Sequence, residues 1–143
     1  MTKLFDNLKL RVLSEGSLTL ADFMGEALGN SEHGYYKNES PIGESGDFIT
    51  SPEISQMFGE LIGLWSAVCW KQLGCPRKFN FIELGPGRGT LLVDAIRAAR
   101  GVPGYLDALE FHLVETSPIL IQCQKQSLSQ IKNNLVWHEN FDH

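Results

Sequence analysis

Three alternate glycines mark the stretch of this chain whose residue types and spacing point most clearly to chemistry. Gly85, Gly87 and Gly89 follow the short apolar run 79–84 and precede a helical pattern that starts at Thr90. The NH groups at the start of a helix carry partial positive charge, and glycine lets a ligand approach the backbone without meeting a Cβ. The spacing matches neither the G-x-G-x-x-G dinucleotide fingerprint nor the G-K-[ST] end of a P-loop. It therefore predicts a nucleotide-like or carboxylate-bearing ligand with no diphosphate to be held.

An acidic residue precedes these glycines. The stretch Glu83-Leu-Gly-Pro-Gly-Arg-Gly-Thr90 resembles the first motif of class I S-adenosylmethionine-dependent methyltransferases, where the loop bends around the methionine part of the cofactor. The resemblance implies S-adenosyl-L-methionine as cofactor, with these residues binding it: Glu83, Gly85, Pro86, Gly87, Gly89 and Thr90. The loop alone leaves two other interpretations open, a dehydrogenase-like site and a glycine turn that binds nothing.

Each of the three predicted strands has an acidic residue in or just after its carboxyl end. Glu115 ends the second strand, where its two carboxylate oxygens match the two neighbouring hydroxyls of a ribose. Glu139 follows the third strand and is expected to reach an adenine amino group. Glu83 stands in an otherwise apolar strand and needs a partner if buried, either the loop NH groups or the ammonium group of the cofactor. The alternative for Glu115 is a solvated acid at a strand end.

Helical spacing of apolar residues predicts the elements that come before the glycines. Two helices are expected, one from Leu4 until Gly16 and one over 20–28. A third, longer helix begins at Ser51-Pro52-Glu53 and continues to Gly74. Its residues leave little polar face, so we expect it to be largely buried.

Glycine, proline, tyrosine and acidic residues dominate the segment 30–50, which predicts a long ordered loop. Loops of this length are uncommon in compact domains and often bind ligands or cover sites. Gly34-Tyr-Tyr36 and Gly46-Asp-Phe-Ile-Thr50 are its candidate functional segments. A merely solvated connector is the alternative.

Beyond Cys75-Pro76 the pattern alternates between strand and helix. The expected elements are strands over 79–84, 110–115 and 135–138, and helices over 90–100 and 118–131. Such alternation implies a parallel sheet whose ligand crevice lies at the carboxyl ends of the strands. The predicted fold class is α/β, a Rossmann-like three-stranded half sheet preceded by a helical segment and a long loop.

Composition limits the possible classes of function. The chain has 143 residues and a net charge of -5, which argues against a general nucleic-acid binder and suits a basic or neutral partner. Its three cysteines are an odd number without C-x-x-C spacing, which indicates a reducing compartment. The four histidines show no ligand spacing, so no metal is expected. No signal peptide or membrane span is expected, and the chain is predicted to be cytoplasmic.

Several motifs together resemble the MidA family, whose mitochondrial members help to assemble respiratory complex I. The resemblance runs from about Leu20 to the end of the chain. The segment Gly-Asp-Phe-Ile-Thr-x-Pro-Glu beside the glycine loop is its most specific part. The motifs that carry it are Gly34-Tyr-Tyr36, Gly46-Asp-Phe-Ile-Thr-Ser-Pro-Glu-Ile-Ser55, Phe58-Gly-Glu60, Glu83-Leu-Gly-Pro-Gly-Arg-Gly-Thr90 and Val114-Glu-Thr-Ser-Pro118.

The resemblance implies a protein arginine methyltransferase, which in eukaryotes acts in the mitochondrial matrix on a complex I subunit. By the same resemblance, Asp47, Thr50 and Glu53 match the segment expected beside the donor methyl group. A guanidinium acceptor needs carboxylates that hold it as a bidentate pair. Asp47 and Glu53 are therefore the hypothesised catalytic residues, with Glu60 as a further acid nearby. Alternatively, Asp47 bonds a turn and Glu53 only compensates the helix dipole.

Members of the MidA family continue well past the length of this chain. We therefore expect a fragment, with an N-terminal helical or lid segment over 1–75 and half of a cofactor-binding domain over 76–143. The exposed edge of its first strand predicts a homodimer, or pairing with a missing C-terminal half. Two other functions stay open: a non-catalytic assembly module that holds a partner with the Tyr35-Tyr36 loop, and a nicotinamide-dependent oxidoreductase, which Gly89-Thr90 disfavours.

Overall fold

The computed structural model describes residues 2–38, 46–131 and 134–141, and the chain divides into two compact units. The first unit is Met1–Pro41 and the second is Ile42–His143. This division does not coincide with the boundary expected at residue 75. The long helix before residue 75 packs along a helix that follows the glycine loop, and so belongs to the second unit.

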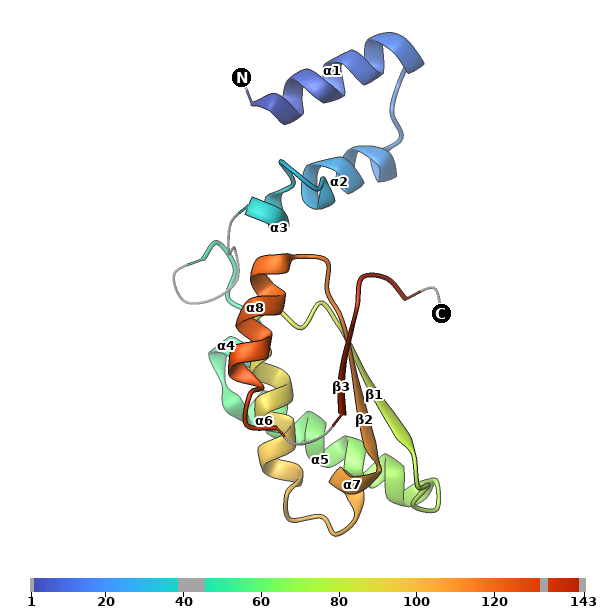
Figure 1. Ribbon diagram of the computed structural model, residues 1–143, viewed down its shortest axis with the longest axis vertical. Coiled ribbons are helices and arrows are strands. Elements are labelled where there is room, and N and C mark those ends of the chain that lie inside the picture. The colour runs from blue at the N-terminus through green and yellow to red at the C-terminus, as the bar shows by residue number, and fades with distance from the viewer. Residues whose placement is uncertain (1, 39–45, 132–133, 142–143) are drawn as a thin grey trace. The chain divides into compact units, whose positions relative to one another are not determined.

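The described residues of the first unit form three helices, α1 (Lys3–Glu15), α2 (Leu20–Gly29) and α3 (Tyr35–Asn38) (Figure 1). Threonine hydroxyls cap the first two, because the Phe5 amide donates to Thr2 at 3.4 Å and the Asp22 amide donates to Thr19 at 3.1 Å. The two predicted helices are confirmed. The short helix α3 lies where a loop was expected, and residues 39–45 of that loop lie outside the described residues.

The second unit begins with two consecutive helices, α4 (Ser51–Ile54) and α5 (Gln56–Gln72). The prediction of one continuous helix is wrong, because Ser55 adopts an extended backbone with φ -152° and ψ 126°. The Ser55 hydroxyl accepts the Met57 amide at 3.2 Å and so caps the start of α5. The break thus turns a residue within the helical pattern into the cap of a new helix.

Three parallel strands form the sheet of the second unit: β1 (Phe79–Leu84), β2 (Leu109–Val114) and β3 (Asn134–His138). Their order is β1-β2-β3, with Phe81 opposite Phe111 and Phe111 opposite Leu135. Helices α6 (Thr90–Ala99) and α8 (Pro118–Ser127) connect them, as the alternating pattern predicted. The helix α7 (Tyr105–Ala108) was not predicted.

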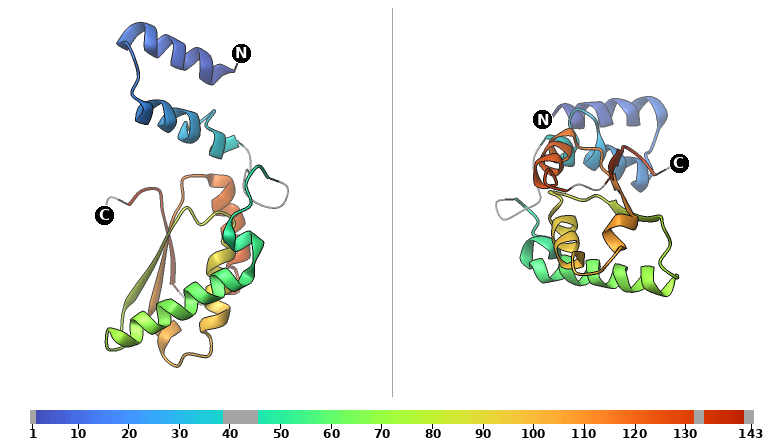
Figure 2. Two further views of the ribbon diagram at one scale, coloured as in Figure 1. Left: turned by 180° about the vertical axis from the view of Figure 1, so that it is seen from behind. Right: turned by 60° about the horizontal axis from the view of Figure 1, so that its bottom comes forward.

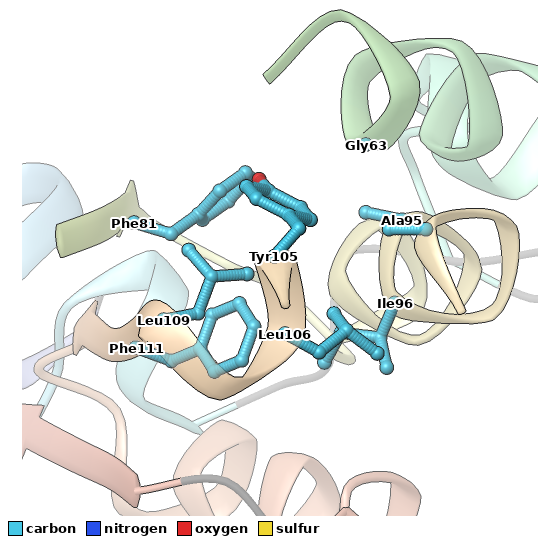
Figure 3. Close-up of a pocket in the computed structure, with 9 residues that line it drawn as sticks. Gly63, Phe81, Ala95, Ile96, Tyr105, Leu106, Leu109 and Phe111 are labelled. Atoms are coloured by element: carbon cyan, nitrogen blue, oxygen red, sulfur yellow. The ribbon is translucent and has the colours of Figure 1, made fainter. Parts of the chain in front are cut away.

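The helices of the second unit lie on one side of the sheet, as two opposite views show (Figures 1 and 2). Alternate side chains of the strands point toward them and form the core, including Phe111 and Leu113, which are 1% and 0% exposed. The Tyr105 hydroxyl bonds to the Ser66 hydroxyl at 2.7 Å, which joins α7 to α5. Figure 3 shows this interior, where Tyr105 and Leu109 lie near Phe81 of β1 and Phe111 of β2. Its lining is apolar, so it is a packed core rather than a site for a polar ligand.

Helix α5 buries only one of its faces. Small residues dominate the buried face, including Gly59, Gly63 and Ala67. Large apolar side chains occupy the other face, with Leu61 58% exposed and Trp65 64% exposed. The prediction of a largely buried helix is therefore wrong. One side of α5 packs against α6, whereas no described residue covers its opposite side. None of the described helices combines the length and apolar character needed to cross a bilayer.

Candidate functional site

The glycine loop joins the end of β1 to the start of α6. Gly85, Gly87 and Gly89 have φ values of 65°, 57° and 82°, in the left-handed region that favours glycine. The Gly85 amide donates to the Val114 carbonyl at 3.0 Å, and the Gly89 amide donates to the Pro86 carbonyl at 2.8 Å. The loop is thus anchored to β2 and folded on itself. The backbone geometry by itself therefore accounts for its glycines.

A cavity of about 370 Å³ lies between this loop and α4. It is placed at the carboxyl end of β1, where parallel sheets with helical crossovers bind their ligands. Seven of the residues predicted from the sequence line it: Thr50, Glu53, Glu83, Gly85, Pro86, Gly87 and Thr90. The structure therefore brings the predicted loop and one predicted catalytic acid together.

Glu53 connects α4 to the first turn of α6. The Thr90 hydroxyl donates to Glu53 Oε1 at 2.5 Å, and Arg88 Nη1 lies 3.9 Å from Glu53 Oε2. The Glu53 side chain is 15% exposed, whereas that of Arg88 is 52% exposed. Because its partners come from the glycine loop and the first residue of α6, Glu53 holds this part of the cavity wall in place.

Glu83 is a second acidic residue that lines the cavity. Its Oε2 atom is buried and has no hydrogen-bond donor among the described residues. Burial disfavours the charged form of a carboxyl group and raises the pKa of Glu83 to about 7. The side chain is thus suited to a ligand that brings a donor or a cation.

Glu115 follows β2 directly and is only 8% exposed. Its Oε1 atom accepts the amides of Thr116 and Ser117, each at 2.8 Å. These bonds hold the carboxylate toward its own turn, so it is an ordered group and not a solvated strand-end acid. The residue does not line the cavity beside Glu83.

Gln124 of α8 is a site residue that the sequence did not suggest. It is 0% exposed, and its Nε2 atom donates to the Gly87 carbonyl at 2.8 Å and to Glu115 Oε2 at 3.3 Å. Its Oε1 atom accepts the indole NH of Trp137 at 2.9 Å. The sequence did contain a signal that could have identified this residue. Gln124 is the polar residue in a buried row that it forms with Leu120 and Leu128 at a spacing of four residues.

The remaining predicted residues lie elsewhere. Asp47 and Glu139 are exposed and do not line the cavity. Glu60 accepts Arg97 at 2.9 Å, which directs this acid toward α6. Tyr35 and Tyr36 belong to the first unit, where their rings meet edge to face with centroids 5.2 Å apart. Within the described ranges, His, Cys, Asp and Glu form no group of three or more that could hold a metal.

Residues 61–143 match the model of a family described as putative S-adenosyl-L-methionine-dependent methyltransferases. The chain is 46% identical over 121 residues to a Drosophila melanogaster protein named protein arginine methyltransferase NDUFAF7 homolog, mitochondrial. It is 42% identical over 134 residues to protein arginine methyltransferase NDUFAF7, mitochondrial, of Homo sapiens. These matches cover 83% and 92% of this chain but only 27% and 30% of the relatives, so the chain spans less than a third of their length.

Two crystal structures from Burkholderia thailandensis have the same fold. One is a likely methyl transferase bound to S-adenosyl-homocysteine, with a TM-score of 0.81 and 23% identity, matched over 96% of this chain and 37% of that chain. The other is an uncharacterised protein of the same superfamily, with a TM-score of 0.73 and 25% identity, matched over 96% and 35%. The predicted α/β fold class is thereby confirmed.

Proposed function

The chain belongs to the family of putative S-adenosyl-L-methionine-dependent methyltransferases, and from this premise we propose that its glycine loop binds S-adenosyl-L-methionine for methyl transfer to an arginine side chain. The observation that carries the proposal is the buried Oε2 atom of Glu83, which has no donor among the described residues and borders the cavity. An unpaired acid of this kind fits a ligand that brings its own cation. The ammonium group of the methionine part is such a cation.

The cavity has the size and the lining that this part of the cofactor needs. Its volume lies in the range of about 300–1,000 Å³ that is usual for small-molecule sites. A Cβ at Gly85 would meet nothing within 4 Å, which leaves the backbone open to a ligand. We assign the ammonium group to Glu83 and the methionine carboxylate to the loop formed by Gly85, Pro86, Gly87, Gly89 and Thr90. Pro86 has no NH, and the amides of Gly85 and Gly89 already donate to Val114 and Pro86, so these three residues shape the loop and do not donate to the carboxylate. The ribose is assigned to Glu115 and the adenine amino group to Glu139.

When bound, the cofactor supplies a methyl group on a sulfonium centre that a nucleophile attacks in line. The side chains of this chain then have to orient a guanidinium group and exclude competing acceptors. Arg88 already shows a guanidinium facing Glu53 Oε2, and its exposed side chain can leave that place to a substrate arginine. We assign Glu53 and Asp47 to hold the substrate, with Glu53 also positioned by Thr90. An arginine nitrogen would gain the methyl group and lose a proton, while the sulfur keeps the electron pair of the broken bond.

The names of the relatives support a protein substrate and, in a eukaryotic source, a mitochondrial location. By the family resemblance, we propose the mitochondrial matrix. By the family resemblance, the substrate is a complex I subunit; in a bacterial source the enzyme acts in the cytoplasm. We also propose self-association through β1, an edge strand whose Ile82 and Leu84 side chains are 45% and 64% exposed.

Isothermal titration calorimetry with S-adenosylmethionine, S-adenosylhomocysteine and NADH tests the proposal. The two sulfur nucleosides should bind and NADH should not. Transfer of a labelled methyl group to an arginine peptide should fall with Asp47→Asn while S-adenosylhomocysteine affinity stays within about twofold, because Asp47 does not line the cavity. Cofactor binding without any transfer to protein would favour a non-catalytic assembly module, and no binding would contradict the assignment of the glycine loop.

A further inference from the structure

Gln124 connects three parts of the second unit that are far apart in the sequence. Its side chain lies in α8, the Gly87 carbonyl belongs to the glycine loop, Glu115 begins the turn after β2, and Trp137 lies in β3. The residue is completely buried, so none of these bonds is exchanged with water. A primary amide has two donor hydrogens and one acceptor oxygen, and all three are used here.

The hydrogen bond from Trp137 determines which way the amide points. The indole NH can only donate, so the group it meets must be the amide oxygen. The amide nitrogen is therefore directed at the Gly87 carbonyl and at Glu115 Oε2, two acceptors that would repel the oxygen of a flipped amide. This arrangement leaves one orientation for Gln124.

The same contacts control the orientation of Glu115. Its Oε1 atom is held by the amides of Thr116 and Ser117, and Gln124 donates to its Oε2 atom. The two oxygens are therefore held in one plane at a defined angle to the glycine loop. Gln124 also packs beneath that loop, since a Cβ at Gly89 would lie 3.7 Å from its Cα and Cγ atoms.

We propose that Gln124 is a positioning residue for nucleoside recognition, which holds the Glu115 carboxylate at a set distance from the glycine loop so that both ribose hydroxyls are bound at once. The inference rests on the proposed function, because it concerns the ribose of a nucleoside bound at that loop. Gln124 itself is too deeply buried to touch the ligand. Through Glu115, Gln124 makes the protein bind a nucleoside with both ribose hydroxyls more tightly than one that lacks them.

Gln124→Met in the full chain tests the inference, because methionine has nearly the same length but makes none of the three bonds. Calorimetry compares S-adenosylhomocysteine with an analogue that lacks the ribose hydroxyls. We expect the wild-type preference for S-adenosylhomocysteine to fall about ten- to hundredfold, the range expected for one misplaced hydrogen bond to a charged group. The matched control is Gln122→Met, at an exposed position of the same helix, which should keep the preference.

A merely structural role for Gln124 gives a different result. Both ligands would then lose affinity by the same factor and the preference would stay at its wild-type value, which overturns the inference. Wild-type protein that binds neither ligand would instead overturn the proposed function and the inference with it. If Gln124→Met does not fold, as judged by circular dichroism, Trp137→Phe decides, since it keeps an aromatic ring but removes the indole NH that sets the amide orientation. Unchanged preference in that folded variant also overturns the inference.

Discussion

At the scale of single residues, the site combines one acid without a partner and two acids with several. Glu53 and Glu115 accept hydrogen bonds from hydroxyl, amide or backbone groups, so their positions are set before any ligand arrives. Glu83 differs, because its buried Oε2 atom has no donor among the described residues. An unpaired buried acid lowers stability and is retained where function needs it.

The raised pKa of Glu83 predicts how stability depends on pH. The folded state holds a proton up to about pH 7, whereas the unfolded state releases it near 4.5. The folded state therefore binds more protons in this window, and the free energy of unfolding falls as the pH rises through it. Glu83→Gln does not titrate, so at pH 8 it should be more stable than the wild type by about 1–3 kcal/mol.

Urea unfolding of both proteins at pH 5 and pH 8 measures this difference. Glu139→Gln is the control, because that acid is exposed and should change stability by less than about 0.5 kcal/mol at either pH. Equal pH dependence in the wild type and in Glu83→Gln would show that Glu83 is not responsible.

At the scale of elements, close packing of α5 against α6 positions the glycine loop. A Cβ at Gly59 would lie 2.8 Å from the Leu91 carbonyl oxygen, and a Cβ at Gly63 would lie 2.6 Å from Ala95 Cα. Arg97 of α6 adds an ion pair with Glu60 at 2.9 Å. Because α6 starts directly after the loop, its contact with α5 sets where the loop ends.

Gly63→Ala should disrupt this contact. The added methyl group meets backbone atoms of α6, which cannot move aside as a flexible side chain would, so we expect a loss of about 1–3 kcal/mol. Thermal or urea unfolding measures it. Gly101→Ala is the matched control, since a Cβ there meets nothing within 4 Å and φ is not positive, and it should change stability by less than about 1 kcal/mol. Equal stability of the two variants would argue against close packing of α5 on α6.

At the scale of the whole molecule, the hydrophobic core formed by the described residues belongs to the second unit. Its buried residues run from Ala67 and Trp70 of α5 to Leu128 after α8. The first unit has its own short helices, and no residue of α1 or α2 is buried. The cavity at the glycine loop is likewise lined only by residues of the second unit.

Deletion of residues 1–41 should therefore leave the second unit folded. Circular dichroism should show less helix but a cooperative unfolding transition within a few degrees of that of the full chain. Deletion of residues 1–75 is the contrasting variant, because it removes α5 and with it the core side chains of Ala67 and Trp70. That variant should lose cooperative unfolding, and if it does not, the boundary expected at residue 75 would describe the stable domain better.

The sequence by itself determined the elements whose signals are local. Apolar periodicity located both N-terminal helices, the three strands and the connecting helices α6 and α8 but not α7, and glycine spacing located the loop with Gly85, Gly87 and Gly89. These features depend on residues that are neighbours in the chain, so the sequence alone is enough to predict them. The break at Ser55 was missed because the apolar spacing continues across it.

Only the tertiary structure decided which side chains meet across the fold. Thr90 bonds to Glu53, and Gln124 bonds to Gly87, each across 37 positions of sequence. It also decided that α5 exposes one apolar face, because burial depends on what packs against a helix and not on its own composition. Gln124 illustrates the reason most clearly: its partners lie on a loop, a turn and a strand that become neighbours only when parallel strands bring their carboxyl ends to one edge of the sheet.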